Sequence, residues 1–421
     1  MLTHLRRMTP PLVLRPDQQG AWDVGLGSQT GSLVAALLDG RLRLVAAFLA
    51  EEAEEDGDLD SEEEALLLLV SPGPLTVAAA GAVIRQLKQS ASLDLGGRPR
   101  ITSSHVFDDA ACRHRFRFTA LKLEELHFRL FGEQRVVVVG HEAFNTTEAL
   151  LVTLQKLAFP TRLRTLSDDY GRHVSTLSRM FNWVVLEYMA DHHARLFGNP
   201  ARFRLFVRDW IHAARDKGVP FDGIGAIDGT RMSIARPGRY QELCYNGYFG
   251  GHCLNYLLLV GANGLVLTMY GPVEGTRHDA HLFRVGAFHE RLEQLLGGHR
   301  AAYPLVGVGA DPAFPQTEYV YPIIKSTKAN PVLPGSPERA YNTSNSRLLR
   351  IISEWGVKQT KLHWKALGLT AEMPLWRPGC GVGNLFCFAT FLSNAMSCSQ
   401  GGNQISSYYG LAAPSLEIYM A

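Results

Sequence analysis

Three acidic residues, Asp228, Asp311 and Glu354, have the side chains needed to bind divalent metal ions. Asp228 and Asp311 each come just after a short apolar run, 224–227 and 305–308, and such runs are typical of buried strands. Carboxylates at the ends of neighbouring strands can meet outside a sheet, where their oxygens suit Mg²⁺ or Mn²⁺. Two such ions about 3.5–4 Å apart support phosphodiester hydrolysis. The chain has 40 acidic residues, so residue type alone does not establish the site.

Glu354 lies in a segment, 344–363, that is predicted to be one helix. Its apolar stripe consists of Leu348, Ile351, Ile352 and Trp355. A neighbouring line at three-and-four spacing consists of Arg347, Arg350, Glu354, Lys358 and Lys361. This line is either a phosphate-facing surface with one metal ligand or a helix with intrahelical ion pairs, and spacing alone favours the ion pairs.

The elements around these acids alternate between strand and helix after residue 219. Segments 254–260 and 265–270 are rich in β-forming residues and are joined by Gly261-Ala-Asn-Gly264, which predicts a hairpin. Segment 279–296 is predicted to be a helix with Asp279 as its N-cap. A proline-containing stretch, 312–337, then leads to the helix that carries Glu354. The order is strand, hairpin, helix, strand, loop and helix.

Residues 106–218 have helical periodicity and form a predicted all-helical domain. One helix ends at Pro160, a polar turn is expected at 166–171, and a second helix is expected over 174–197. This outline is typical of a helix-turn-helix, which would place Arg172 and Arg179 near the start of a DNA-binding helix. Most helix pairs only pack together, so the outline alone is weak evidence for DNA binding.

Residues 1–105 are poorly patterned, and their apolar spacing predicts only short helices at 42–50 and 79–88. The chain has 42 Lys+Arg and 40 Asp+Glu, a net charge of +2. The run EEAEEDGDLDSEEE at 51–64 holds 10 of these acids, so the other 407 residues carry +12. A basic body fits a polyanionic partner, whereas a solvated acidic loop on an ordinary enzyme explains the same numbers.

Cysteine spacing and hydropathy exclude several classes of protein. None of the six cysteines forms a CxxC pair or a zinc-finger pattern with histidine, so reduced and mostly buried thiols are expected. The longest apolar stretch, 253–270, is interrupted by asparagine and glycine, so no membrane span is expected. The first residues, MLTHLRRMTPP, do not resemble a signal peptide. These features indicate a soluble intracellular protein.

The motifs around the three acids resemble the catalytic core of PIF/Harbinger transposases. In chain order they are AIDGT at 226–230, IARP at 234–237, YNG at 245–247, HCL at 252–254, GPVEG at 271–275, RHD at 277–279, ADPAFP at 310–315, YN at 341–342, the set Arg347, Arg350, Glu354, Gly356 and Lys358, SYYG at 407–410 and PSLEIY at 414–419. Upstream, EALL at 148–151, LAFP at 157–160, YGR at 170–172 and LS at 177–178 resemble the helical region of fungal-type members. Each motif is weak, but so many in this order, from about residue 116 onward, form a specific resemblance.

The resemblance implies an α/β protein with an RNase H-like (retroviral-integrase-like) mixed sheet flanked by helices over 219–421, preceded by the helix-turn-helix-like domain. It implies a DDE endonuclease whose Asp228, Asp311 and Glu354 hold two Mg²⁺ or Mn²⁺ ions. Asp279 is the alternative second ligand. Arg347, Arg350, Lys358 and Lys361, together with Arg172 and Arg179, are the expected DNA-binding residues.

The implied activity is metal-dependent cleavage, and strand transfer, at transposon ends. Relatives usually recognise DNA ends through a Myb/SANT-like protein, so the expected partners are DNA, such a protein and further copies of the chain, in the nucleus. One departure from the family is Tyr248-Phe-Gly-Gly251, where many members have a His-Lys-Arg stretch. Because that loss of positive charge lowers the expected DNA affinity, the alternative is a domesticated or decayed, non-catalytic DNA- or protein-binding factor.

Overall fold

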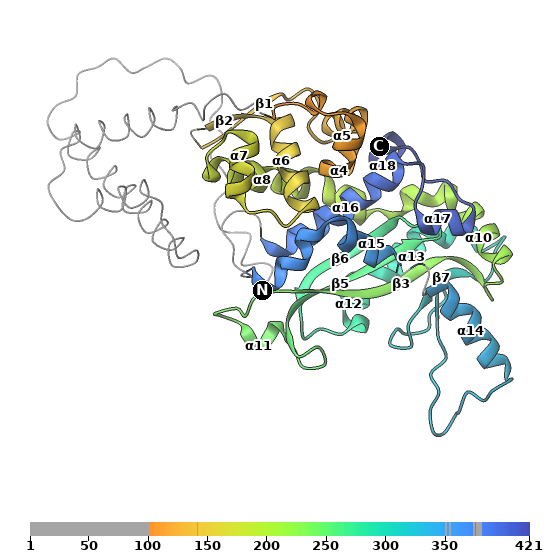
Figure 1. Ribbon diagram of the computed structural model, residues 1–421. Coiled ribbons are helices and arrows are strands. Elements are labelled where there is room, and N and C mark those ends of the chain that lie inside the picture. The colour runs from red at the N-terminus through yellow and green to blue at the C-terminus, as the bar shows by residue number, and fades with distance from the viewer. Residues whose placement is uncertain (1–100, 141, 350–351, 353–354, 374, 376–380) are drawn as a thin grey trace, which may run out of the picture. The chain divides into compact units, whose positions relative to one another are not determined.

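A computed structural model describes residues 101–421 except 141, 350, 351, 353, 354, 374 and 376–380 (Figure 1). The acidic run 51–64 and the expected helices at 42–50 and 79–88 lie outside the described residues. Arg350 and Glu354 lie outside them as well.

A mixed sheet forms the centre of the C-terminal half (Figure 1). Its strands are β3 (Asp222–Ser233), β4 (Tyr245–Asn246), β5 (Gly251–Gly261), β6 (Val266–Glu274), β7 (Val306–Ala310) and β8 (Val320–Pro322). β3 pairs antiparallel with β5 and parallel with β7, β5 pairs antiparallel with β6 and β4, and β7 pairs parallel with β8. The middle of β5 is buried on both faces, which explains its nearly uninterrupted apolar sequence. The predicted hairpin is confirmed as β5–β6, with Gly264 at φ +75° in the turn.

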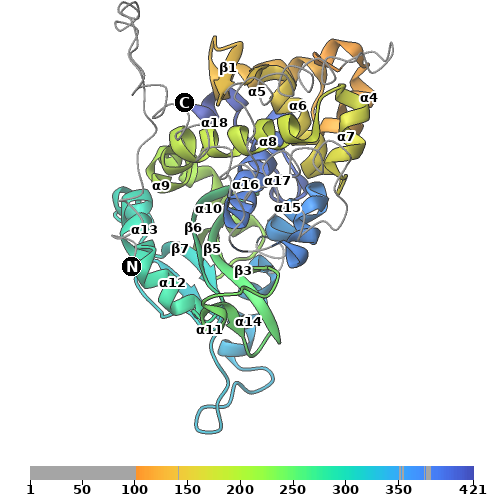
Figure 2. The same ribbon diagram turned by 90° about the vertical axis from the view of Figure 1, so that its left-hand side faces the viewer.

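Helices cover both faces of this sheet. In Figure 2 the sheet separates α12 (Asp279–Val285) and α13 (Phe288–Leu296) from α15 (Trp355–His363), α16 (Val382–Ser399) and α17 (Gln404–Tyr409). A curled mixed sheet between helical layers is compatible with the expected RNase H-like fold. Most of α16 is buried, and Tyr256 in β5 donates a 2.9 Å hydrogen bond to the Gly383 carbonyl in α16.

The region before the sheet is mainly helical. Its helices are η2 (Ser104–Val106), α4 (Asp109–Phe116), α5 (Ala120–Phe131), α6 (Thr146–Ala158), α7 (Leu163–Tyr170), α8 (Val174–Tyr188), the π-turn η3 (Met189–His193), α9 (Ala194–Gly198), η4 (Pro200–Phe206) and α10 (Val207–Asp216). The prediction of an all-helical domain is wrong, because β1 (Val136–Val139) and β2 (Glu142–Asn145) form an antiparallel pair. The helix that ends before Pro160 is confirmed as α6.

The prediction of a polar turn at 166–171 is also wrong, because residues 166–170 belong to α7. Leu166 and Tyr170 are buried four residues apart, and the polar residues between them lie on the outer side of the helix. Only Gly171, in the left-handed conformation, begins the real turn before α8. The local order is therefore α6, α7, short turn and α8.

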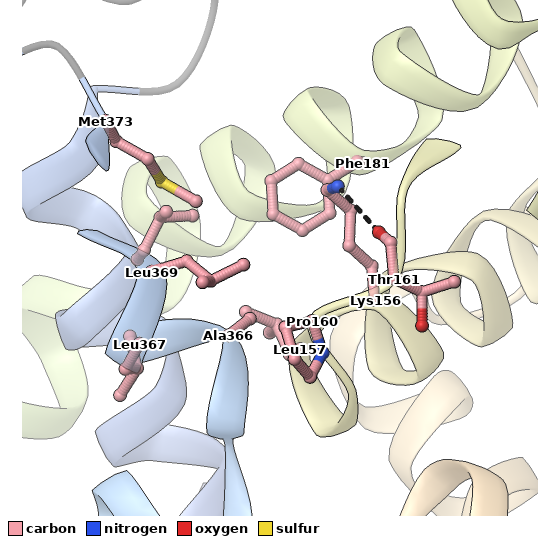
Figure 3. A pocket seen from close by; sticks show the side chains of 10 residues that line it. Lys156, Leu157, Pro160, Thr161, Phe181, Ala366, Leu367, Leu369 and Met373 are labelled. Carbon is pink, nitrogen blue, oxygen red and sulfur yellow. Dashed lines mark hydrogen bonds between the residues drawn. The ribbon is translucent and has the colours of Figure 1, made fainter. Parts of the chain in front are cut away.

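The helical region packs directly onto the C-terminal half. Figure 3 shows a small apolar pocket lined by Leu157, Pro160 and Phe181 on one side and by Leu369 and Met373 on the other. The two last-named residues belong to or follow η7 (Lys365–Glu372), and Lys156 closes one side by donating to the Thr161 carbonyl at 3.4 Å. Residues 97–421 form one compact unit, and the expected domain boundary near residue 219 stays a prediction.

Two further helix predictions need correction. The segment 279–296 is broken at Gly286 and Ala287, because Ala287 takes a left-handed φ of +52°. Asp279 is the first residue of α12, and His278 is the N-cap. α14 (Pro337–Leu349) begins seven residues earlier than expected, with proline in its first turn, and α15 begins at Trp355.

The remaining elements close the C-terminal half. They are α11 (Gln241–Cys244), η5 (Gly297–His299) and α18 (Leu416–Met420). The five cysteines that the structure describes are buried free thiols, as expected. Among the described residues, no helix combines the length and apolar character needed to cross a membrane.

Candidate active site

Asp228 in β3 and Asp311 directly after β7 occupy neighbouring positions where the pairing of the two strands ends. β3 and β7 run parallel, and their last paired residues are Ile227 and Ala310, so each aspartate is the next residue on its strand. β7 ends there, whereas β3 continues to Ser233. The edge of β3 from Asp228 onward therefore has no β7 residue beside it. Asp228 is half-buried, and Asp311 is exposed in a turn in which its Oδ1 accepts from the Ala313 amide at 2.9 Å.

Asp228 faces the helical layer that contains α15 and α16. Successive strand residues point to opposite faces, and paired residues of neighbouring strands share a face. Thr230 pairs with Tyr256, whose hydroxyl reaches α16, so Thr230 and Asp228 face that layer. Glu354 immediately precedes α15, although its own position lies outside the described residues.

Asp279 lies at the opposite face of β3. A Cβ on Gly229 would be only 2.2 Å from Asp279 Oδ1, so the carboxylate lies directly on the glycine backbone. Burial raises the pKa of Asp279, and the charge of Asp311 raises it further, whereas Arg231 and His278 act in the opposite direction. Asp311 is thus the acid close to both others, and Asp279 stands apart from Asp228 across the strand. The N-cap role expected for Asp279 is wrong.

Lys361 is the predicted DNA-binding residue that reaches the site. From α15, its Nζ donates to the Arg231 carbonyl at 2.9 Å and lies 3.5 Å from Thr230 Oγ1. Burial of the ammonium lowers the pKa of Lys361, and the nearby Arg231 charge lowers it further. A cation therefore lies beside the face that carries Asp228.

Other predicted basic residues occupy different surroundings. Lys358 is exposed on α15, and Arg347 belongs to α14. Arg172 makes a bidentate pair with the fully buried Glu148, with nitrogen–oxygen distances of 2.8 and 2.9 Å. Arg179 pairs with Glu142 at 2.9 Å. The structure does not bring Arg172 or Arg179 to the acids.

Sequence reasoning missed two features of this region. Arg231, three residues after Asp228, lies with its guanidinium carbon 5.9 Å from the Tyr248 ring centre and 5.3 Å from that of Phe249. Gly229 provides the space for Asp279. The signals available in the sequence were the DGTR string and the aromatic pair in the turn, but the pairing of β3 with β5 was needed to join them.

Among the described residues, no group of three or more histidine, cysteine, aspartate or glutamate side chains is arranged to hold a metal ion. The described part of the site contributes two adjacent carboxylates, Asp228 and Asp311. Hard divalent cations prefer such oxygen donors.

Comparison with known families identifies the same segment. Residues 227–394 match the DDE superfamily endonuclease model. The match begins one residue before Asp228 and contains Asp279, Asp311 and Glu354. It supports a transposase-derived nuclease, and nucleases of this superfamily typically use divalent metal ions. No curated protein and no solved structure matches the chain.

Proposed function

We propose that this protein is a transposase-type DNA endonuclease of the PIF/Harbinger kind, with Asp228, Asp311 and Glu354 as its catalytic acids. The observation that carries the proposal is the β3–β7 register, which makes Asp228 and Asp311 neighbours where β7 ends. The match to DDE superfamily endonucleases over the same residues supports it independently.

The donor set fits divalent cations. Asp228 and Asp311 are adjacent and at least partly accessible, and Glu354 immediately precedes α15 in the sequence. These residues would hold two Mg²⁺ or Mn²⁺ ions, which when bound supply activation of the attacking oxygen and stabilisation of the leaving oxygen. Asp279 lies on the other face of β3, which favours Asp311 as the second ligand.

The basic residues near the acids would hold the DNA backbone. Lys361 is anchored to the Arg231 carbonyl and keeps its ammonium beside the Asp228 face, where a scissile phosphate would lie. Lys358, exposed on the same helix, together with Arg347 and Arg350 would extend the contact along the strand. Arg172 and Arg179 would contribute to DNA binding from the helical region only if their ion pairs with Glu148 and Glu142 open.

The proposal also specifies the reaction, the cellular compartment and the partners. Water would attack a phosphodiester at the transposon end, and the freed 3′-hydroxyl would then attack target DNA. The work would take place in the nucleus, with a Myb/SANT-like protein for end recognition and with further copies of this chain. Co-purification with a tagged copy of the chain from nuclear extract tests these partners.

Mn²⁺-dependent nicking of supercoiled DNA carrying candidate terminal repeats tests the activity. We expect Asp228→Asn and Asp311→Asn, which keep side-chain size, each to reduce nicking by at least about a hundredfold, since both acids would act on the transition state. Asp209→Asn, on the exposed surface of α10, is the matched control and should nick like the unaltered protein.

Two outcomes would contradict the proposal. Nicking that survives both site substitutions would show that these acids are not catalytic. DNA binding with no nicking in Mn²⁺ or Mg²⁺ would favour the domesticated, non-catalytic factor.

A further inference from the structure

The turn between β4 and β5 carries exposed aromatic rings. Tyr248 is 95% exposed and Phe249 is 44% exposed, and Tyr245 at the start of β4 is 46% exposed. Rings of this size are normally buried, and a cluster of them on the surface commonly marks a binding site. They occupy the position where family resemblance predicts a basic stretch.

The turn is held in one conformation. Asn246 donates from its side chain to the Gly275 carbonyl at 2.8 Å and accepts from the Phe249 amide at 2.9 Å. Gly250 donates to the Asn246 carbonyl at 2.8 Å and has φ +74°, a conformation that favours glycine. The exposed rings therefore project from a fixed turn, which lowers the entropy lost when they bind a partner.

Arg231 connects the rings to the acids. Both rings lie within 6 Å of its guanidinium, a distance typical of cation–π contacts. Arg231 is three residues beyond Asp228, about 10 Å along an extended strand, which corresponds to roughly three stacked bases. Because successive strand residues alternate, Arg231 shares the face of Gly229, and its charge acts on Asp279 there. A cationic and aromatic surface therefore lies on the Asp279 side of β3, three residues along the strand from Asp228.

We propose that Arg231, Tyr248 and Phe249 form a stacking platform for an unpaired base of the DNA strand that is cut at Asp228 and Asp311. Aromatic rings bind the flat face of a base, which is covered by its neighbours in continuous duplex and open in a frayed end. The guanidinium adds attraction to the phosphate backbone. The platform rests on the proposed function, and it specifies that function further: the substrate is an opened DNA end.

Binding to matched DNAs tests the platform. We would measure fluorescence anisotropy with a blunt duplex and with the same duplex carrying a short unpaired arm, in Ca²⁺ to prevent cutting. The unaltered full chain should prefer the forked DNA. The double substitution Tyr248→Ala with Phe249→Ala should weaken forked-DNA binding on the order of five- to a hundredfold and change blunt-duplex binding less than about twofold.

Two variants and one probe make the test specific. Tyr248→Trp should retain the preference because it keeps a stacking ring. Phe128→Ala removes a ring of similar exposure, 47%, from α5 in the helical region and should bind both DNAs normally. 2-Aminopurine in the unpaired arm should be quenched by the unaltered protein and less by the double variant.

Equal affinity of the unaltered protein for both DNAs would overturn the platform, as would an equal loss for both DNAs in the double variant. The nicking assay separates this inference from the proposed function. Asp228-dependent nicking without any fork preference would leave the function standing and remove the platform. Fork preference that depends on the rings, without nicking, would leave the platform standing and remove the catalytic function.

Discussion

At the scale of single residues, the site depends on two neighbours, Asp228 and Gly229, that face opposite sides of β3. Asp228 faces the layer of α15 and α16, whereas the bare face of Gly229 receives the Asp279 carboxylate. Asp228 and Asp279 therefore lie on opposite faces of β3, and the absence of a side chain at Gly229 makes room for Asp279.

We predict that Gly229→Ala destabilises the protein by about 1–3 kcal/mol, because the new methyl group would overlap the Asp279 carboxylate and force it to move. The free energy of unfolding in urea measures this. Gly238→Ala is the control, since a Cβ there meets nothing within 4 Å. Combining Gly229→Ala with Asp279→Ala should recover most of the loss. A stable single variant would contradict the described contact.

Asp279 also predicts a pH dependence. Its pKa is raised in the folded protein, so the folded state binds this proton more tightly than the unfolded state, and stability falls as pH rises through the folded pKa. Without metal, Asp279→Asn should therefore stabilise the protein at neutral pH. The gain should vanish below the ordinary aspartate pKa of about 4. Urea unfolding in EDTA at the two pH values measures this, and an equal gain at both would exclude Asp279 as the cause.

At the scale of elements, Arg172 in the short turn between α7 and α8 has a structural role. Arg172 neutralises Glu148, which is fully buried in α6, so Arg172 ties α6 to the start of α8. Arg179, two turns into α8, makes a partly exposed ion pair with Glu142 of β2.

We predict that Arg172→Ala lowers the free energy of unfolding by about 3 kcal/mol, because it leaves a buried carboxylate without its partner. Arg179→Ala should cost less, about 1 kcal/mol, since its pair with Glu142 is partly exposed to solvent and screened by it. Urea unfolding and DNA affinity should be measured on both variants. Normal stability with reduced DNA binding in Arg172→Ala would favour a direct DNA contact instead.

Elements with a strong local signal were predictable from the sequence. The β5–β6 hairpin follows from its glycine turn, and α6 follows from its apolar spacing and Pro160. α7 was missed because its sequence, LRTLSDDY, is mostly polar and only Leu166 and Tyr170 mark the buried side. The break between α12 and α13 was missed because Ala287 takes a left-handed conformation that its residue type does not favour.

At the scale of the whole molecule, charge is unevenly distributed along the chain. Residues 1–96 contain 14 acidic and 7 basic side chains, a net charge of −7. Residues 97–421 therefore carry a net charge of +9, which gives the total of +2. Residues 97–421 also form one compact unit with its own core.

We predict that a chain beginning at Gly97 unfolds in a single cooperative transition and binds DNA more tightly than the full chain. The truncation removes 14 acidic and 7 basic side chains, a net charge of −7, and so reduces repulsion of phosphate; the gain should be largest at low salt and shrink as salt screens it. Anisotropy across a salt series measures the affinity, and calorimetry measures the transition. Equal affinity of the two chains at low salt would show that the net negative charge of residues 1–96 does not weaken DNA binding.

The site was predictable only in part, because its members come from distant segments. Asp228 and Asp311 could be chosen from strand endings and family resemblance, and their adjacency follows from the register of β3 and β7. The face on which Asp279 lies follows from its contact with Gly229, which no sequence pattern indicates. Arg231 and Tyr248 are 17 positions apart, and no local sequence pattern predicts their contact, because it depends on how β3, β4 and β5 pair.

The central place of β3 also affects the order of events during synthesis. β3 pairs with β5 and with β7, and both partners follow it in the sequence. Asp228 leaves the ribosome 83 residues before Asp311. At 5–20 residues per second, about 4–17 s pass in which the β7 side of this apolar strand has no native partner. The helical region, made earlier from mostly local contacts, can fold in that interval and offer a surface for the nascent strands. The two carboxylates can become neighbours only after β7 has been made, so a chain that stops before residue 311 carries no assembled pair.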